Sequence, residues 1–148
     1  MGGGNEHKDP TAALQLNFIS HATLESRDLE ASKKFYEEFL GLDVVYMSHI
    51  ALCLRLGGNN TIVVVKTNNR HEMPMINHNG LDVGSTEEVD AAYRIVVEQK
   101  DKWGLHKITP PKEQHGSYSF YFWDADENCW EILRNSPVGY ANLFAAKD

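Results

Sequence analysis

Residues 28 to 42 read Asp-Leu-Glu-Ala-Ser-Lys-Lys-Phe-Tyr-Glu-Glu-Phe-Leu-Gly-Leu, and this stretch decides the first half of the fold. Asp28 is a good N-cap, because its carboxylate can accept a hydrogen bond from a free backbone N–H group of the first turn. Gly41 stands where a glycine in the left-handed conformation commonly ends a helix. The stretch therefore predicts one helix, whose apolar face consists of Leu29, Phe35, Phe39 and Leu40.

The segments on either side of this helix have the composition of strands. An alternating stretch runs from Leu14 to about Glu25, and the turn Gly57-Gly58-Asn59-Asn60 separates two of the later apolar segments. We predict one strand before the helix and three after it, the latter at residues 44–48, 51–56 and 61–67.

The second half of the chain repeats this order. Residues 76–83 predict a strand that carries His78, and Ser85-Thr86-Glu87-Glu88 matches a capping box at the start of a second helix that ends near Trp103-Gly104. Three more strands are predicted at residues 105–109, 118–123 and 129–134.

The spacing of two histidines supports a duplication. His21 lies seven residues before the N-cap Asp28, and His78 lies seven residues before the N-cap Ser85. If the two halves are related by a pseudo-two-fold axis, these equivalent histidines can face one metal ion. The other histidines, which we expect to be solvated or structural, are His7, His49, His71 and His106.

We therefore predict an α+β fold of two pseudo-repeated βαβββ modules that form a cupped mixed sheet around a metal site. The modules cover residues 14–67 and 76–135 of a single domain, 14–135. Residues 1–13 combine glycines, charges and Pro10 and are expected to be a disordered tail. Residues 136–148 are expected to be a C-terminal tail.

Charge and hydropathy exclude several functions. Fourteen basic and 21 acidic residues give a net charge of −7, without a Lys/Arg stripe, which argues against nucleic-acid binding. The run Ile62 to Val65 is too short to span a bilayer, and the N-terminus lacks the apolar core of a signal peptide. We expect a soluble, cytoplasmic protein with no membrane partner, whose two cysteines, Cys53 and Cys129, are reduced thiols in the core.

Glu131 is an acidic residue within the apolar run Cys-Trp-Glu-Ile-Leu. It either points outward from a half-exposed strand or is buried with a positive partner, because a lone buried carboxylate is costly. His21, His78 and Glu131 together would make a 2-His-1-carboxylate site, which suits Fe(II) and leaves positions open for substrate and oxygen. Mn(II), Ni(II) and Zn(II) are alternatives.

At these residues the sequence resembles the vicinal oxygen chelate superfamily, which includes glyoxalase I, extradiol dioxygenases and fosfomycin-resistance transferases. The resemblance spans about residues 16–134 and rests on the opening strand and helix and on the closing stretch 119–131, Ser-Phe-Tyr-Phe-Trp-Asp-Ala-Asp-Glu-Asn-Cys-Trp-Glu. It implies that the metal ligands are His21, His78 and Glu131. Glyoxalase I draws a fourth ligand from the last strand of its first module, and residues 61–67 offer no carboxylate or imidazole there.

The stretch from His115 to Glu131 is similar to the extradiol dioxygenase signature, although Ala125 and Glu127 replace its usual proline and glycine and the His to Tyr gap is one residue short. The resemblance implies that His115 is the acid-base group and that Tyr121 hydrogen-bonds a substrate oxygen. A core aromatic with a satisfied hydroxyl is the alternative for Tyr121.

The resemblance therefore favours an Fe(II) extradiol-type dioxygenase that acts on a small catechol-like or vicinal-oxygen aromatic substrate and O2. The alternatives are a thiol or glutathione transferase of the fosfomycin-resistance type, to which Thr23, Ser119 and Tyr121 are also similar, and a glyoxalase-like lyase or isomerase. A binding protein of the bleomycin-resistance type would lack the ligands. A homodimer is expected, in which one site can draw its ligands from two chains.

Overall fold

The computed structural model describes residues 9–58, 60–114, 116–135 and 144. The chain divides into two compact units, Met1–Asn69 and Arg70–Asp148, so the division falls between the two predicted modules. Residues 1–8 of the predicted N-terminal tail, and residues 136–143 and 145–148 of the predicted C-terminal tail, lie outside the described residues.

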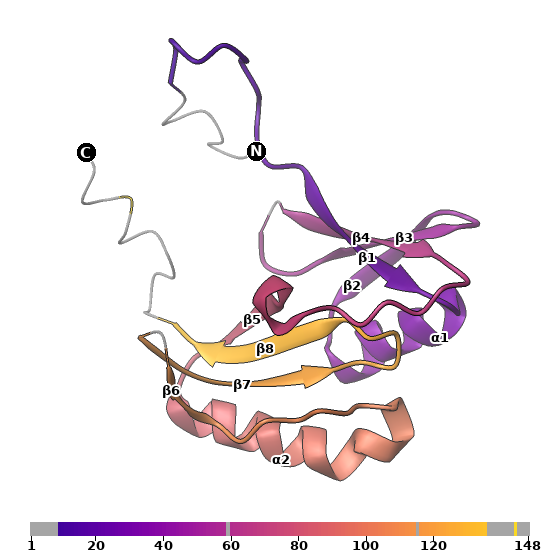
Figure 1. The fold of residues 1–148 in the computed structure, drawn as a ribbon, viewed down its shortest axis with the longest axis vertical. Helices are drawn as coiled ribbons and strands as arrows, with labels where there is room; N and C mark the ends of the chain where they lie inside the picture. Colours follow the sequence, from indigo (N-terminus) through magenta and orange to yellow (C-terminus); the bar gives the residue numbers. More distant parts are fainter. Residues whose placement is uncertain (1–8, 59, 115, 136–143, 145–148) are drawn as a thin grey trace. The chain divides into compact units, whose positions relative to one another are not determined.

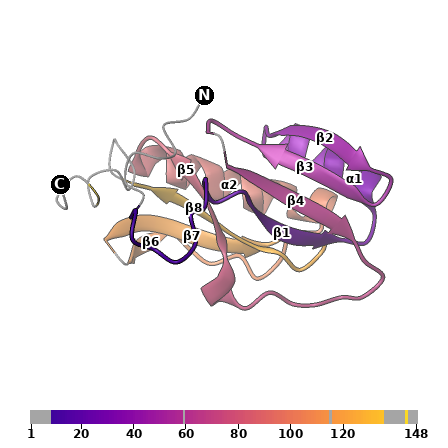
Figure 2. The same ribbon diagram turned by 90° about the horizontal axis from the view of Figure 1, so that it is seen from above.

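The first unit contains a four-stranded mixed sheet with the strand order β1-β4-β3-β2, which Figure 2 shows from above. β1 pairs in parallel with β4, and the other neighbours are antiparallel. The elements are β1 (His21–Ser26), α1 (Leu29–Lys34), the π-helical turn η1 (Phe35–Phe39), β2 (Asp43–Ser48), β3 (Ala51–Arg55) and β4 (Thr61–Lys66).

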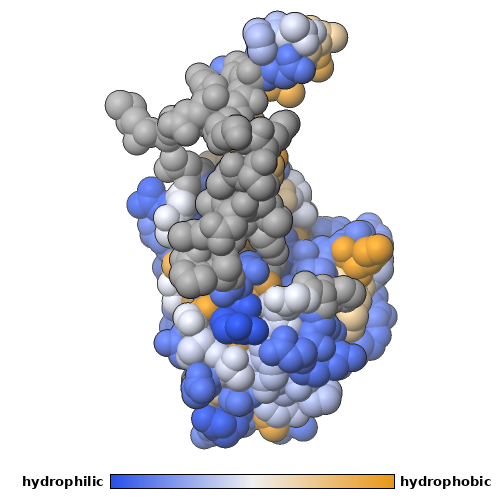
Figure 3. Space-filling view, turned by 90° about the vertical axis from the view of Figure 1, so that its left-hand side faces the viewer, coloured by the Kyte–Doolittle hydropathy of each residue, from blue (hydrophilic) through white to orange (hydrophobic). Residues whose placement is uncertain are grey.

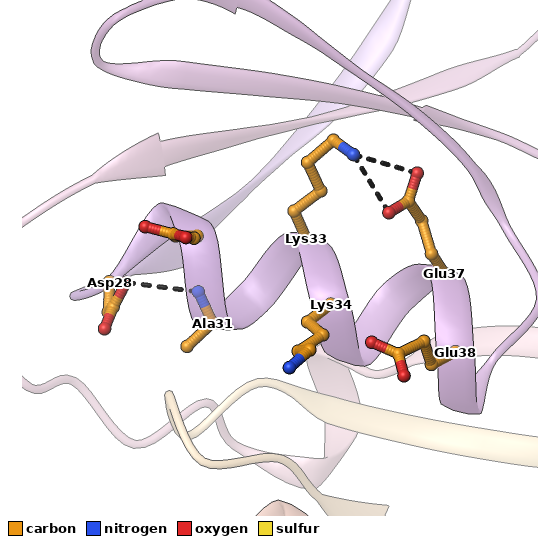
Figure 4. A pocket seen from close by; sticks show the side chains of 7 residues that line it. Asp28, Ala31, Lys33, Lys34, Glu37 and Glu38 are labelled. Atoms are coloured by element: carbon orange, nitrogen blue, oxygen red, sulfur yellow. Dashed lines mark hydrogen bonds and ion pairs between the residues drawn. The ribbon is translucent and has the colours of Figure 1, made fainter.

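The first helix begins and ends where the sequence predicts. The Asp28 carboxylate accepts a hydrogen bond from the backbone N–H of Ala31 at 3.1 Å, and Lys33 forms an ion pair with Glu37 one turn later at 2.9 Å (Figure 4). Gly41 has a positive φ of 71°, which a residue with a Cβ adopts only at a cost. The prediction of a capped helix over this stretch is confirmed, with its last turn widened to a π-helix.

The second unit repeats the topology of the first. Its sheet has the order β5-β8-β7-β6, in which β5 is parallel to β8 and the other neighbours are antiparallel. The predicted α+β fold of two βαβββ modules is therefore confirmed. The elements are the 3₁₀ turn η2 (Met75–Asn77), β5 (Asn79–Val83), α2 (Thr86–Trp103), β6 (Lys112–Gln114), β7 (Ser117–Trp123) and β8 (Cys129–Arg134). Figure 1 labels α2 and the four strands.

α2 packs against β7 and β8 on one face of the second sheet. Phe120, Phe122 and Trp130 are each 0% exposed, and the ring of Tyr93 meets that of Phe120 edge-on at 5.4 Å. Burial of each such aromatic side chain stabilises the fold by about 1.5–3 kcal/mol. Because side chains alternate along a strand, Tyr121 and Glu131 lie on the opposite face of this sheet.

Two predicted strands begin too early. His21 pairs with Thr61, which is the first residue of β4. The described residues 14–20 therefore pair with no strand of the described chain and are not in the sheet. In the second unit the 3₁₀ turn follows Pro74, so the strand starts only at Asn79. His78 therefore lies at the junction of turn and strand, and its prediction as a strand residue is wrong.

The strand predicted at residues 105–109 is also wrong. Lys107 has a positive φ of 52°, which interrupts an extended chain, and only an isolated bridge joins His106 to Trp123. Two prolines, Pro110 and Pro111, follow, and the second strand of this module forms later, at Lys112–Gln114.

Hydrophilic residues predominate on the coloured part of the face shown in Figure 3. No helix within the described ranges has the length and apolar character required to cross a membrane. In the first unit, exposed large apolar side chains concentrate in the stretch before β1 and on β2: Leu14, Leu16, Phe18, Ile19, Val45, Tyr46 and Met47.

Candidate metal centre

His78 is held by the turn that precedes it. The Met75 carbonyl oxygen accepts two hydrogen bonds from His78, one from the backbone N–H at 3.1 Å and one from the ring Nδ1 at 2.7 Å. A carbonyl can only accept, so Nδ1 carries a proton. The other ring nitrogen, Nε2, therefore points away from the turn and lies 3.2 Å from Oε1 of Glu131.

Glu131 occupies the middle of β8 and is 7% exposed, between two buried neighbours. Of the two alternatives left open by the sequence, the buried carboxylate is the one observed. Within the described part of the chain its ion-pair partner is His78. A neutral imidazole nitrogen and a carboxylate oxygen both present lone pairs, so a proton or a metal ion between them removes their repulsion.

Tyr121 completes this group on the neighbouring strand. It is the cross-strand partner of Glu131, and its ring meets that of His78 edge-on with centroids 5.0 Å apart. Burial, and then the negative charge of Glu131 and a hydrogen bond to it, raise the pKa of Tyr121 to about 12. The phenol therefore keeps its proton at neutral pH and can act as a hydrogen-bond donor.

The donor pair fits a divalent ion. Two metal–ligand bonds of about 2.1 Å at a right angle place their donor atoms about 3 Å apart, close to the observed separation of His78 Nε2 and Glu131 Oε1. Imidazole and carboxylate are also the ligands that Fe(II), Mn(II) and Zn(II) accept. Groups of three or more His, Cys, Asp or Glu side chains suited to a metal do not occur among the described residues.

His21, the third predicted ligand, is the first residue of β1 and belongs to the first unit. Its side chain is exposed, and Nδ1 lies 2.8 Å from the hydroxyl of Ser20. Its assignment as a ligand stays a prediction. His115, the predicted acid-base residue, lies outside the described residues.

The strand registers show how the modules differ at the equivalent positions. Glu131 pairs with Gly80, two residues after His78, and Val63 pairs with Thr23, two residues after His21. Val63 is therefore the counterpart of Glu131, so the first module supplies no carboxylate from this position. The counterpart of Tyr121 is Cys53, because Cys53 pairs with Val63 as Tyr121 pairs with Glu131.

A second His–Glu pair in this unit was not predicted. His106 Nε2 lies 3.0 Å from Oε2 of Glu127, and Nε of Arg70 lies 3.6 Å from its Oε1. The guanidinium already supplies a positive charge here, which distinguishes this pair from the one at Glu131. The sequence feature that could have indicated this pair is Glu127, which stands where the related dioxygenase signature has glycine. In the structure Glu127 has a positive φ of 69°.

Both cysteines are free thiols; Cys129 lies in the core, as predicted, whereas Cys53 is only half-buried. Burial, followed by the charges of Asp124 and Glu131, raises the pKa of the Cys129 thiol to about 12, so it remains protonated. The charged hollow at α1 in Figure 4 contains none of the predicted site residues; its lining is Asp28, Glu30, Ala31, Lys33, Lys34, Glu37 and Glu38.

Comparison with known proteins identifies the family. The profile of the Glyoxalase/Bleomycin resistance protein/Dioxygenase superfamily matches residues 18–132, and the chain belongs to this superfamily. No curated protein matches the chain.

Solved structures share the fold. One is the genomically encoded fosfomycin resistance protein FosX from Listeria monocytogenes, with a TM-score of 0.63 and 22% identity over 84% of this chain and 98% of that one. Another is lactoylglutathione lyase from Agrobacterium tumefaciens, with a TM-score of 0.59 and 21% identity over 86% and 96% of the two chains. A possible glyoxalase from Bacillus cereus has a TM-score of 0.63 and 24% identity over 78% and 96%. These likenesses establish the fold.

Proposed function

We propose that the chain is a metal-dependent enzyme in which His78 and Glu131 hold a divalent ion and His21 supplies the third ligand. The observation that carries the proposal is the 3.2 Å separation of His78 Nε2 and the buried Glu131 Oε1, with no lysine or arginine side chain paired to Glu131 within the described residues. Fe(II) is the preferred ion, and Mn(II), Ni(II) and Zn(II) are alternatives.

The bound ion would act as a Lewis acid on a substrate with two neighbouring oxygen atoms. Tyr121 would donate a hydrogen bond to a substrate oxygen, since a phenol is protonated at neutral pH and this residue lies beside both His78 and Glu131. Such a donor is most useful where negative charge develops during the reaction. His115 would accept and return a proton of the substrate.

The reaction class that we propose is extradiol-type oxygenation of a small catechol-like or vicinal-oxygen aromatic substrate by O2. It is supported by the similarity of the stretch from His115 to Glu131 to the dioxygenase signature and by the position of Tyr121 beside Glu131. A facial site of two histidines and one carboxylate leaves positions for both substrate and oxygen.

A second candidate is the addition of a nucleophile such as a thiol to an electrophile. It is supported by the fold shared with two fosfomycin resistance proteins, from Listeria monocytogenes and Mesorhizobium loti. A glyoxalase-like reaction, supported by the fold shared with the lactoylglutathione lyase, is disfavoured by Val63, which stands where a fourth ligand would be needed.

Anaerobic purification, loading with Fe(II) and an oxygen electrode would test the reaction class. We expect oxygen uptake with one of a panel of catechols, vicinal diols and enediols. Absence of uptake with the whole panel, together with consumption of glutathione in the presence of an epoxide, would replace the dioxygenase by the transferase and leave the metal site in place.

We also propose a homodimer in the cytoplasm. Val45 and Met47 on the edge strand β2 are each 57% exposed, and exposed apolar side chains at a sheet edge suit contact with a second copy. Light scattering on a gel-filtration column should give twice the chain mass of 16.7 kDa. A monomer at micromolar concentration would refute this part of the proposal.

A further inference from the structure

We infer that residues 70–77, here called the strap, set the orientation of His78 through an anchor on Trp123 and thereby control the affinity of the metal site. The inference rests on the proposed function, because it assigns positioning residues to the proposed ligand His78. In Figure 1 the strap is the segment that contains η2 and leads into β5.

Met73 is fixed through both of its backbone groups. Its carbonyl oxygen accepts a hydrogen bond from the indole Nε1 of Trp123 at 2.8 Å, and its N–H donates to the carbonyl of Glu127 at 2.9 Å. Its side chain packs against the buried cluster of Tyr121, Trp123 and Cys129. One strap residue is therefore attached to both β7 and the turn before β8.

The path from this anchor to His78 is short and stiff. The ring of Pro74 fixes its φ, here −64°, and Asn77 N–H donates to the Pro74 carbonyl at 2.9 Å to close the 3₁₀ turn. The next carbonyl, that of Met75, is the oxygen that accepts both hydrogen bonds from His78. A shift of Met73 would therefore move the acceptor that holds the imidazole ring.

Charged side chains strengthen the attachment at the start of the strap. Arg70 Nη2 donates to the carbonyl of Ala125 at 3.1 Å and its Nε lies 3.6 Å from the Glu127 carboxylate. Glu72 forms an ion pair with Lys107. Glu127 has a left-handed backbone conformation, which glycine would adopt without strain. Its two carboxylate oxygens are paired with Arg70 and His106. The side chain at this position thus contributes contacts to the strap that a glycine could not make.

The partner that orients a ligand histidine usually matters for binding. Loss of such a partner typically lowers metal affinity about 10- to 100-fold, because the ring loses its tautomer and its direction. The structure assigns that role to the Met75 carbonyl, and Trp123 acts on it as a positioning residue through Met73.

Trp123→Phe tests the inference, since it removes the indole N–H and retains an aromatic ring. Trp103→Phe is the matched control, because the Trp103 indole N–H donates at 3.0 Å to Gln99 within α2, whereas that of Trp123 donates to Met73. Zn(II) and Fe(II) affinities would be measured anaerobically against a chelator. We expect Trp123→Phe to bind about 10- to 100-fold more weakly and Trp103→Phe to match the wild type.

A second readout uses the metal-free protein at a pH where imidazoles are neutral. Long-range ¹H–¹⁵N spectra should show His78 as the Nδ1–H tautomer in the wild type and in Trp103→Phe, and as a mixture in Trp123→Phe. A folded Trp123→Phe with wild-type affinity and a wild-type His78 spectrum would overturn the inference while the metal site stands.

Two further outcomes would also decide the inference. If Trp123→Phe does not fold, Glu127→Gly is used instead, since the positive φ of Glu127 suits glycine. A metal affinity about 10-fold lower than that of the wild type would support the inference, and an unchanged metal affinity would overturn it. If the wild type binds neither ion, the proposed function fails, and the tautomer of His78 alone decides whether the strap orients the ring.

Discussion

Asp124 is the most deeply buried carboxylate near the candidate site, and its titration should be visible in the stability of the fold. It is 3% exposed and sits in the turn between β7 and β8, the strands that carry Tyr121 and Glu131. One carboxylate oxygen accepts from the backbone N–H groups of Asp126 and Asn128, and the other from the Trp130 indole at 2.9 Å and the Asn128 side chain at 3.2 Å.

Burial raises the pKa of Asp124 from 3.8 to about 6, although the hydrogen bonds from Trp130, Asn128 and Asp126 oppose the shift. Between these two pH values the folded protein holds the proton and the unfolded chain has released it. The folded state then binds more protons, so the free energy of unfolding decreases as the pH rises through this window. A difference of about two pKa units corresponds to about 3 kcal/mol.

Asp124→Asn removes the titration. Urea unfolding followed by tryptophan fluorescence would give the free energy of unfolding of both proteins between pH 4 and 6.5. Across this range we expect the free energy of unfolding of the wild type to fall by about 2 kcal/mol relative to that of the variant. A pH-independent offset of about 1–3 kcal/mol is added, because indole and amide donors lose their acceptor in the variant. A difference that is independent of pH, or that grows in favour of the wild type as the pH rises, would refute the reasoning.

Three further predictions concern chemistry and local conformation. Tyr121→Phe should keep the metal but lower turnover of an identified substrate on the order of 10²-fold, as steady-state kinetics would show, because it removes one hydrogen-bond donor; unchanged turnover would remove the residue from the mechanism. His115→Ala should lower the rate and abolish one limb of the pH–rate profile, and a profile of wild-type shape would exclude an acid-base role. Gly104→Ala should lower the free energy of unfolding by about 1–2 kcal/mol, as thermal unfolding would show, because φ at this residue is 70° and the new Cβ would lie 3.2 Å from the Cβ of Ala125. Gly58→Ala is the control, because a Cβ there would meet no atom within 4 Å.

The sequence predicted those parts of the fold that local chemistry determines. Asp28 and Ser85 cap the two helices as predicted. Their side-chain oxygens accept hydrogen bonds from backbone N–H groups three residues later, and this contact depends on no distant part of the chain. The strand 129–134 was predicted with its observed bounds. The repeated topology followed from the repeated order of these signals.

The sequence could not predict features that depend on pairing between distant segments. Residues 14–20 alternate like a strand, yet β4 begins at Thr61 and offers them no partner. Burial of Glu131 was undecided because periodicity alone does not say which face of β8 is covered. Two hydrogen bonds around His78 were also not predictable: His78 Nδ1 donates to the Met75 carbonyl, and the Trp123 indole donates to the Met73 carbonyl. Both acceptors are backbone groups, which every residue has, so the sequence does not mark them.

Metal content of wild-type and variant protein is the most direct test of the central claim. After anaerobic loading and desalting, mass spectrometry should find about one divalent ion per chain in the wild type and in His49→Ala, whose histidine lies in an exposed turn. His78→Ala and Glu131→Ala should fold but retain little metal, because a site that has lost one of its few ligands binds weakly. Full occupancy in either variant, or none in the wild type, would contradict the assignment of His78 and Glu131 as ligands.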